Sequence, residues 1–439
     1  MNSQINKIEV ISAIMGSGKS TLFMKRMKDG TVNTPVLYIT PYLNEVNRIL
    51  ENCEGFYQPV IDGTHESKVE SLVTLLEEGV NIASTHMMLN GLPQEAFDAL
   101  RSNDYMVVID EAVSCINNFT IHANDYKMLI DKGLIEVDPK TRLATWNYHP
   151  NDTLTAYKTL QAAIKSGAVY FPDRAASKLG VLAYVWEFPT QIFKEANKVL
   201  VLTYLFEGSL MKPYFEANDL PYVVLDNKEL GLGCEREALA MARALIEISY
   251  YGKNNSIGKS EKLVKPLNDM TLSSTWYGDC KPFNKSKDTK KNASHIRRAA
   301  VAKNMKNVLT NGWKYESKDI IWTAYKKVKS ECTPRSYGDR FVAFNLRATN
   351  DYAHCKGVAY CVNPSINPEW TKHLNFRGAS FDKDLWALSE MVQLLWRGCI
   401  RNGKPMKVFI PSIRMRTLLE NWLNGDYLSE EMEETLLAA

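Results

Sequence analysis

The chain has 439 residues, of which 45% are hydrophobic and 23% charged, as is ordinary for a globular protein of two or three domains. No apolar run approaches the ~18 residues of a membrane span, and the N-terminus MNSQINK is unlike a signal peptide. The cysteines form no C-x-x-C pair and the histidines no H-E-x-x-H pair, which argues against a disulfide framework and a zinc site. We therefore expect a cytoplasmic protein, in the host cytoplasm if it is viral, without membrane contact.

The net charge of +3 conceals an asymmetry between the two halves. Residues 1–215 carry 19 Lys and Arg against 24 Asp and Glu, a balance of −5. Residues 216–439 carry 34 against 26, a balance of +8. A basic second half is consistent with nucleic-acid binding but does not establish it.

Residues 8–21, IEVISAIMGSGKST, read as a buried strand, a glycine loop and a helix N-terminus. The stretch A-x-x-x-x-G-K-S matches a phosphate-binding loop, with alanine for the usual first glycine. Glycines let the backbone N–H groups point at a phosphate, Lys19 can reach the β- and γ-phosphates, and the Ser20 hydroxyl can bind Mg²⁺. The loop therefore predicts a site for a nucleoside triphosphate with Mg²⁺. The predicted nucleotide-binding residues are Met15, Gly16, Ser17, Gly18, Lys19, Ser20 and Thr21.

Further apolar strands alternate with helices along the first half, near residues 36–40, 80–83, 199–203 and 221–226. The strand at 36–40 ends at Thr40-Pro41-Tyr42, before a helical pattern. A hydroxyl and a helix N-terminus there would suit a nucleic-acid phosphate, although a plain N-cap explains the segment as well.

The segment 105–113, YMVVIDEAV, runs from four apolar residues into Asp110 and Glu111. This pattern predicts a buried parallel strand that delivers two acids at its carboxyl end. In a nucleotide hydrolase the first acid holds Mg²⁺ and the second polarises the attacking water. Residues 119–190 contain scattered aromatic residues without a chemical motif, and we expect an insertion whose aromatics are core rather than base-stacking surfaces.

The second half repeats the alternation, with expected strands near 271–276, 319–324, 341–345, 358–362 and 406–410 and helices near 235–250, 293–309, 381–399 and 412–423. The segment 281–306 carries nine Lys and Arg and one acid, which is either a solvated surface or a contact for nucleic acid. In SEMVQLLWRGCIRNGKP, at 389–405, the residues Gln393, Arg397 and Arg401 follow one another at a spacing of four. That spacing predicts one helix face, from which arginines could reach a γ-phosphate as an arginine finger.

These segments together predict two RecA-like domains with doubly wound parallel sheets. The first spans residues 1–220, with an insertion at about 119–190. The second spans residues 221–439 and contains the basic segment and the arginine-bearing helix.

The chain resembles superfamily 2 DEAD-like helicases. Within them it is most similar in its motifs to the replicative helicases of the phage and herpesvirus origin-binding type. AIMGSGKST resembles motif I, TPYLNEV motif Ia, VVIDEAV motif II, IIWTAYK motif IV and QLLWRGCIR motif VI. The resemblance implies that Lys19, Ser20 and Asp110 hold Mg-ATP and that Glu111 activates water. It implies catalytic roles for Gln393, Arg397 and Arg401. The implied nucleic-acid contacts are Thr40, Tyr42, Thr85, His86, Lys326, Thr349 and Asn350.

The sequence therefore predicts an ATP-dependent helicase or translocase acting on single-stranded or forked DNA in phage replication, with RNA left open and other replication proteins as further partners. One alternative is a nucleic-acid-stimulated ATPase that does not unwind. Another is an origin-binding protein that uses nucleotide as a switch. A small-molecule kinase is disfavoured because the large second half repeats the alternation of the first.

Overall fold

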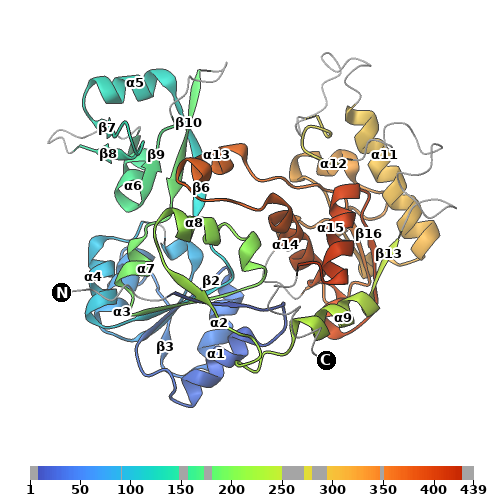
Figure 1. Ribbon diagram of the computed structural model, residues 1–439, viewed down its shortest axis with the longest axis horizontal. Coiled ribbons are helices and arrows are strands. Elements are labelled where there is room, and N and C mark those ends of the chain that lie inside the picture. The colour runs from blue at the N-terminus through green and yellow to red at the C-terminus, as the bar shows by residue number, and fades with distance from the viewer. Residues whose placement is uncertain are drawn as a thin grey trace. The chain divides into compact units, whose positions relative to one another are not determined.

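The computed structural model describes residues 8–89, 91–147, 157–172, 180–249, 271–278, 294–346 and 351–427 (Figure 1). The chain divides into two compact units. Unit 1 comprises Met1–Ala13, Gly18–Leu230 and Ile366–Phe381. Unit 2 comprises Ile14–Ser17, Gly231–Ser365 and Asp382–Ala439.

Unit 1 is built on a parallel sheet in which, among the described residues, seven strands pair in the order β12-β1-β11-β5-β2-β4-β3. The strands are β1 (Ile8–Ser12), β2 (Val36–Thr40), β3 (Phe56–Tyr57), β4 (Asn81–Thr85), β5 (Met106–Asp110), β11 (Lys198–Thr203) and β12 (Tyr222–Val224). The helices that alternate with them are α1 (Lys19–Lys28), α2 (Leu43–Asn52), α3 (Lys68–Glu77), α4 (Gln94–Ser102), α7 (Gln191–Glu195) and α8 (Met211–Ala217).

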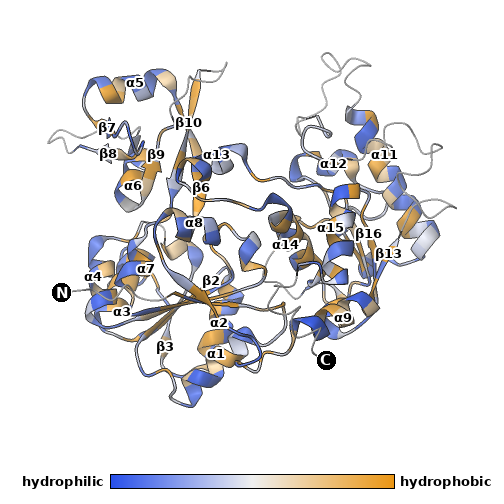
Figure 2. Cartoon of the chain, in the orientation of Figure 1, coloured by the Kyte–Doolittle hydropathy of each residue, from blue (hydrophilic) through white to orange (hydrophobic). Residues whose placement is uncertain are grey.

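The central strands are apolar along almost their whole length because helices cover both faces of a parallel sheet. Every residue of β2 and of β5 is buried. Figure 2 shows hydrophobic colour along the strands of this sheet, whereas the helices around it carry both colours. Since all the strands are parallel, the residues that follow β1, β2, β4 and β5 lie along one edge of the sheet.

The predicted insertion forms an antiparallel layer within unit 1. Its larger sheet has the order β6-β10-β9 and its smaller sheet pairs β7 with β8. Its elements are β6 (Ile116–His122), α5 (Ala123–Asp131), β7 (Ile135–Val137), β8 (Ala144–Trp146), α6 (Lys158–Ser166), β9 (Ala168–Tyr170) and β10 (Val181–Glu187).

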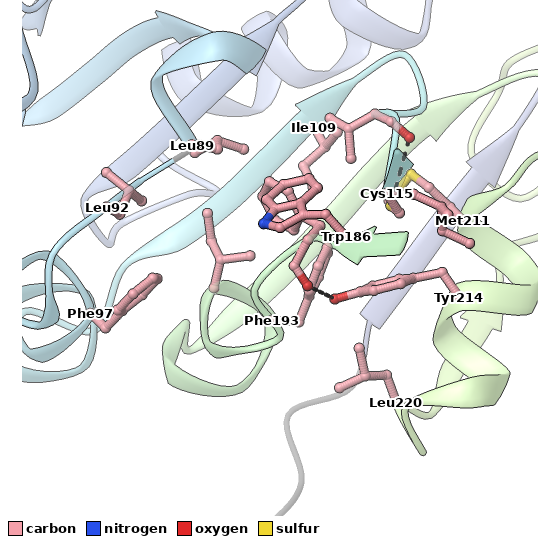
Figure 3. Close-up of a cluster of buried hydrophobic side chains, with 14 of the residues drawn as sticks. Leu89, Leu92, Phe97, Ile109, Cys115, Trp186, Phe193, Met211, Tyr214 and Leu220 are labelled. Atoms are coloured by element: carbon pink, nitrogen blue, oxygen red, sulfur yellow. Dashed lines mark hydrogen bonds between the residues drawn. The ribbon is translucent and has the colours of Figure 1, made fainter. Parts of the chain in front are cut away.

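Most of the described aromatic residues of this layer are core residues, as predicted, whereas Phe119 of β6 is 41% exposed. Trp146 and Phe171 belong to the apolar cluster of unit 1, and Tyr126 packs against it. Figure 3 shows Trp186 of β10 in the same cluster as Ile109 of β5. The layer and the large sheet therefore share one core.

A helix from the second half of the sequence packs in unit 1. The helix α13 (Pro368–Phe376) lies beside β6 and β10 (Figure 1). Glu187, at the end of β10, is 1% exposed and accepts from His373 Nε2 at 2.6 Å and from Arg377 Nη1 at 3.3 Å. Arg377 also donates to the carbonyl of Ala217 at 2.7 Å. The alternation pattern assigned residues 366–381 to the second domain, whereas these contacts join them to unit 1.

Unit 2 contains a second parallel sheet, in which four strands of the described residues pair in the order β13-β16-β15-β14. The strands are β13 (Ile246–Ser249), β14 (Ile320–Thr323), β15 (Gly357–Tyr360) and β16 (Met406–Phe409). The helices are α9 (Glu235–Leu245), α11 (Ser294–Lys306), α12 (Lys329–Cys332), α14 (Lys383–Leu395) and α15 (Ile413–Asn424). The predicted fold class, α/β with two parallel-sheet domains, is confirmed.

Three predictions for unit 2 were wrong in detail. Residues 271–276 form turns instead of a strand, with the Ser273 hydroxyl accepting from the backbone N–H of Trp276 at 3.2 Å. Residues 341–345 contribute a single bridge, between Phe341 and Trp322. The predicted helix 235–250 ends at Leu245, and its last residues form β13, where the alternating β-branched Ile246 and Ile248 favour a strand.

Gly357 illustrates how tightly this second sheet packs. A Cβ atom at Gly357 would lie 2.7 Å from the Trp313 ring, inside the core of unit 2. We predict that Gly357→Ala lowers the free energy of unfolding by about 1–3 kcal/mol through overpacking. The matched control is Gly338→Ala, whose Cβ would meet Thr333 Cγ2 at an ordinary 3.6 Å. Denaturant unfolding of both variants checks this, and equal stabilities would contradict it.

Candidate functional site

The loop between β1 and α1 has the backbone that a phosphate-binding turn needs. Gly16 has φ 83° and Gly18 φ 95°, both in the left-handed region that favours glycine. A Cβ at either position would meet nothing within 4 Å, so the requirement is conformational rather than steric. Gly18 is also the N-cap residue of α1, and its carbonyl accepts from the N–H of Leu22 at 2.7 Å. The loop thus leads directly into a helix N-terminus.

The predicted nucleotide-binding residues Met15–Thr21 occupy this turn and the first turn of α1, and their contacts with a nucleotide stay a prediction. Lys19 Nζ donates to the carbonyl of Ala13 at 2.5 Å. Burial lowers the pKa of Lys19 from 10.5 to about 8, against the opposing effect of the Asp110 and Glu111 carboxylates. The charged ammonium group of Lys19 therefore lies beside the acid pair, and loss of its hydration makes the charged form less favourable than in water.

Asp110 stands at the end of β5, 8% exposed, and it connects three elements of unit 1. Its Oδ2 accepts from Ser20 Oγ at 3.0 Å and from the Tyr38 hydroxyl at 2.6 Å. Burial raises the pKa of Asp110, and the hydrogen bond from Tyr38 acts in the opposite direction. Burial also raises the pKa of Tyr38 well above its ordinary value, so the phenol is a donor at neutral pH. The structure brings the predicted Ser20 and Asp110 together.

Sequence reasoning missed Tyr38. The signal was a hydroxyl-bearing aromatic residue inside the otherwise apolar strand VLYIT. A buried tyrosine hydroxyl needs a hydrogen-bond partner, and the neighbouring strand supplies the carboxylate.

Glu111 has a left-handed backbone with φ 67°, which is uncommon for a residue other than glycine. Its N–H donates to the carbonyl of Leu202 at 2.8 Å, so the neighbouring strand β11 fixes this conformation. Such strain is found preferentially at functional sites.

The residues expected to touch nucleic acid differ in how they are placed. Thr40 is 0% exposed, so the expected surface contact of its hydroxyl is not supported. Tyr42 is 42% exposed. Thr85 is partly exposed, and His86 Nε2 lies 3.2 Å from the backbone oxygen of Asp110, which turns this ring toward the acid pair. Lys326 of unit 2 is exposed, whereas Thr349 and Asn350 lie outside the described residues.

The expectation that Gln393, Arg397 and Arg401 share one helix face was wrong. The helix α14 ends at Leu395, and beyond it the Cys399 N–H donates to the Cys355 carbonyl at 2.9 Å instead of to the carbonyl four residues earlier.

The three side chains consequently have different surroundings. Gln393 is buried on α14 and donates to Ser389 Oγ at 3.0 Å. Arg397 is 6% exposed in the following turn. Arg401 is exposed in a short 3-10 helix, Cys399–Asn402.

The fold is a parallel α/β sheet, and its site combines a left-handed glycine loop, a half-buried lysine and a serine–carboxylate pair. These features define an α/β protein with a P-loop type of strand–loop–helix. The chain belongs to the YonV family, because it is 30% identical over 440 residues to the SPbeta prophage-derived uncharacterized protein YonV of Bacillus subtilis strain 168. That match covers 96% of this chain and 100% of the relative. Residues 240–423 match the family described as the YonV C-terminal Rossmann-like domain, in agreement with the parallel sheet of unit 2.

Among solved structures, the chain is similar to an apo XPD structure, with 13% identity and a TM-score of 0.49 over 94% of this chain and 96% of that one. Similarity to Xpd4 of S. tokodaii has a TM-score of 0.45 at 13% identity, over 97% and 95% of the two chains. Similarity to the DUF1998 helicase MrfA, solved with DNA and AMPPNP, has a TM-score of 0.35 at 9% identity, over 96% of this chain and 48% of MrfA. In the described part of the chain, no helix combines the length and the apolar character that crossing a membrane requires.

The lowered pKa of Lys19 predicts a pH dependence of stability. Between pH 8 and 10.5 the unfolded chain holds the Lys19 proton more firmly than the folded chain, so this residue makes the free energy of unfolding rise with pH across that window. Below pH 8 both states are protonated and the burial cost is fully present. We predict that Lys19→Met is more stable than the wild type at pH 7 and that the difference closes by about pH 10.5.

Thermal or denaturant unfolding at several pH values measures this difference directly. Lys25→Met, on the exposed face of the same helix, is the matched control and should show a small difference that does not change across the window. A constant difference for Lys19→Met would contradict the prediction.

Proposed function

We propose that this protein is a nucleic-acid-dependent ATPase of the helicase or translocase type. The observation that carries the proposal is the cluster in unit 1 in which Ser20 donates to Asp110 at 3.0 Å while the half-buried Lys19 lies beside both acids. A lysine, a hydroxyl and a carboxylate gathered at a glycine loop and a helix N-terminus are the groups that bind a triphosphate with its metal ion.

The residues present fit Mg-ATP. Ser20 and Asp110 offer hard oxygen ligands of the kind that Mg²⁺ prefers, and the left-handed glycines leave the loop open to a phosphate. When bound, Mg-ATP supplies the phosphoanhydride bond that is broken. Lys19 is proposed to balance the phosphate charge, and binding of an anion would favour its protonated form.

Glu111 is the proposed general base. Its carboxylate would orient the attacking water and accept a proton from it, and its left-handed backbone at φ 67° is strain of the kind found at functional sites. Gln393, Arg397 and Arg401 stay proposed contributors from unit 2, with one arginine stabilising charge on the transferred phosphoryl group.

The nucleic-acid part of the proposal is supported by charge and exposure. The balance of +8 in residues 216–439, the exposed Lys326 and the exposed Tyr42 suit phosphate and base contacts. The prophage origin stated for the YonV relative is consistent with a role in phage DNA replication. Single-stranded or forked DNA is the proposed substrate. More specifically, we propose a replicative helicase of the origin-binding type.

The experiment that tests the proposal is steady-state ATP hydrolysis by the full chain, alone and with single-stranded DNA or RNA. Strong stimulation by DNA is expected, and a strand-displacement assay then separates a helicase from an ATPase that does not unwind. An ATP hydrolysis rate that is the same with and without nucleic acid would overturn the helicase or translocase proposal. Negligible turnover with ATP-independent, sequence-specific DNA binding would favour a nucleotide switch.

Two substitutions should separate binding from hydrolysis. Lys19→Ala is expected to weaken triphosphate binding, because it removes the charge that faces the phosphates. Glu111→Gln is expected to preserve binding while slowing hydrolysis by about 10²-fold or more, as for the loss of a positioned general base. Fluorescent-nucleotide titration and turnover measure the two effects, and an equal loss of binding in both variants would contradict the separate roles.

The arginine hypothesis has its own comparison. Arg397→Ala and Arg401→Ala should differ strongly in turnover, with a loss of about 10³-fold for the residue that acts as the finger. Because Arg397 is buried, its variant also requires a melting curve to separate a folding defect from a catalytic one. Equal small losses in both variants would remove the finger assignment.

A further inference from the structure

Tyr38 is placed by strand pairing on both sides of its backbone and by packing of its ring. It lies in the middle of β2, paired with Val108 of β5 on one side and Ala83 of β4 on the other. Its ring centroid is 5.1 Å from that of Phe23 on α1, and the side chain is 0% exposed. The hydroxyl is therefore held in one place between the sheet and the helix that follows the phosphate loop.

In this position the Tyr38 hydroxyl contacts the carboxylate of Asp110. The Tyr38 hydroxyl and Ser20 Oγ both donate to Oδ2, at 2.6 and 3.0 Å, so these two bonds leave Oδ1 to other partners. Under the proposed function Ser20 Oγ is itself a metal ligand, whereas the phenol is locked behind the carboxylate. Tyr38 is then the donor that keeps the Asp110 side chain oriented.

We propose that Tyr38 is a positioning residue, which orients the Asp110 carboxylate toward the divalent cation that accompanies the nucleotide. This inference rests on the proposed function and deepens it. Groups that orient a metal-binding side chain without touching the metal commonly change metal affinity by 10- to 100-fold when they are removed. A tyrosine that served only to fill the core would leave metal affinity unchanged.

Tyr38→Phe removes the hydroxyl and keeps the ring on Phe23. Tyr105→Phe is the matched control, because Tyr105 is also buried in unit 1 and its hydroxyl donates to the carbonyl of Val80 at 2.7 Å instead of to an acid. Both variants lose the hydrogen bonding of a phenol hydroxyl, which for Tyr105 also includes the carbonyl of Leu75 at 3.2 Å, and only the first loses a bond to Asp110. Melting curves of the two variants establish how much each change destabilises the fold.

The measurement is binding of a fluorescent, non-hydrolysable ATP analogue to the full chain across a Mg²⁺ titration and in EDTA. For Tyr38→Phe we expect the Mg²⁺ concentration at half-maximal binding to rise about 10-fold or more, with affinity in EDTA close to that of the wild type. Tyr105→Phe should match the wild type in both conditions. In an Asp110→Asn background, adding Tyr38→Phe should cause no further change, since the tyrosine acts through that carboxylate.

An unchanged Mg²⁺ midpoint in Tyr38→Phe would overturn the inference, as would an equal loss of affinity with and without Mg²⁺. A similar shift in Tyr105→Phe would overturn it too, because the effect would then belong to the fold. These results leave the proposed function intact. A wild-type chain that binds no nucleotide in either condition would instead refute the proposed function, and the role of Tyr38 with it.

Discussion

Parallel pairing of β1, β11, β5 and β2 is the constraint on which the candidate site depends. Residues 19–20 and 110–111 are about ninety positions apart in the sequence, and they meet because their strands end at the same edge of one sheet. The strands are apolar enough to be buried on both faces, so polar side chains are delivered only where the strands stop. Asp110 is the point where loop, helix and neighbouring strand meet.

Much of unit 1 could be predicted because its signals are local. Glycines, a lysine and a serine between a strand and a helix define the loop, and an apolar run ending in two acids defines β5. The order of the strands within the sheet could not be predicted from the sequence. Tyr38 belongs to this site only because β2 pairs with β5, and strand order depends on long-range contacts that leave no periodic trace in the chain.

The errors in unit 2 have a similar cause. A spacing of four between Gln393, Arg397 and Arg401 favours a helix, but α14 ends at Leu395 and the Cys399 N–H pairs with the Cys355 carbonyl instead. Ile246 and Ile248 follow a strong helical pattern, yet pairing with β16 makes them a strand. In each case a tertiary contact overrode a local preference, as is common at the ends of helices and strands.

The return of α13 to unit 1 bears on how this chain is synthesised. Glu187 is made early, whereas His373 and Arg377 leave the ribosome some 190 residues later. Until then the Glu187 carboxylate lacks both of these hydrogen bonds and keeps the one from Asn218, at 3.1 Å. The first unit thus cannot reach its final form before most of the second has been translated. An excised fragment ending at residue 230 would keep that defect permanently.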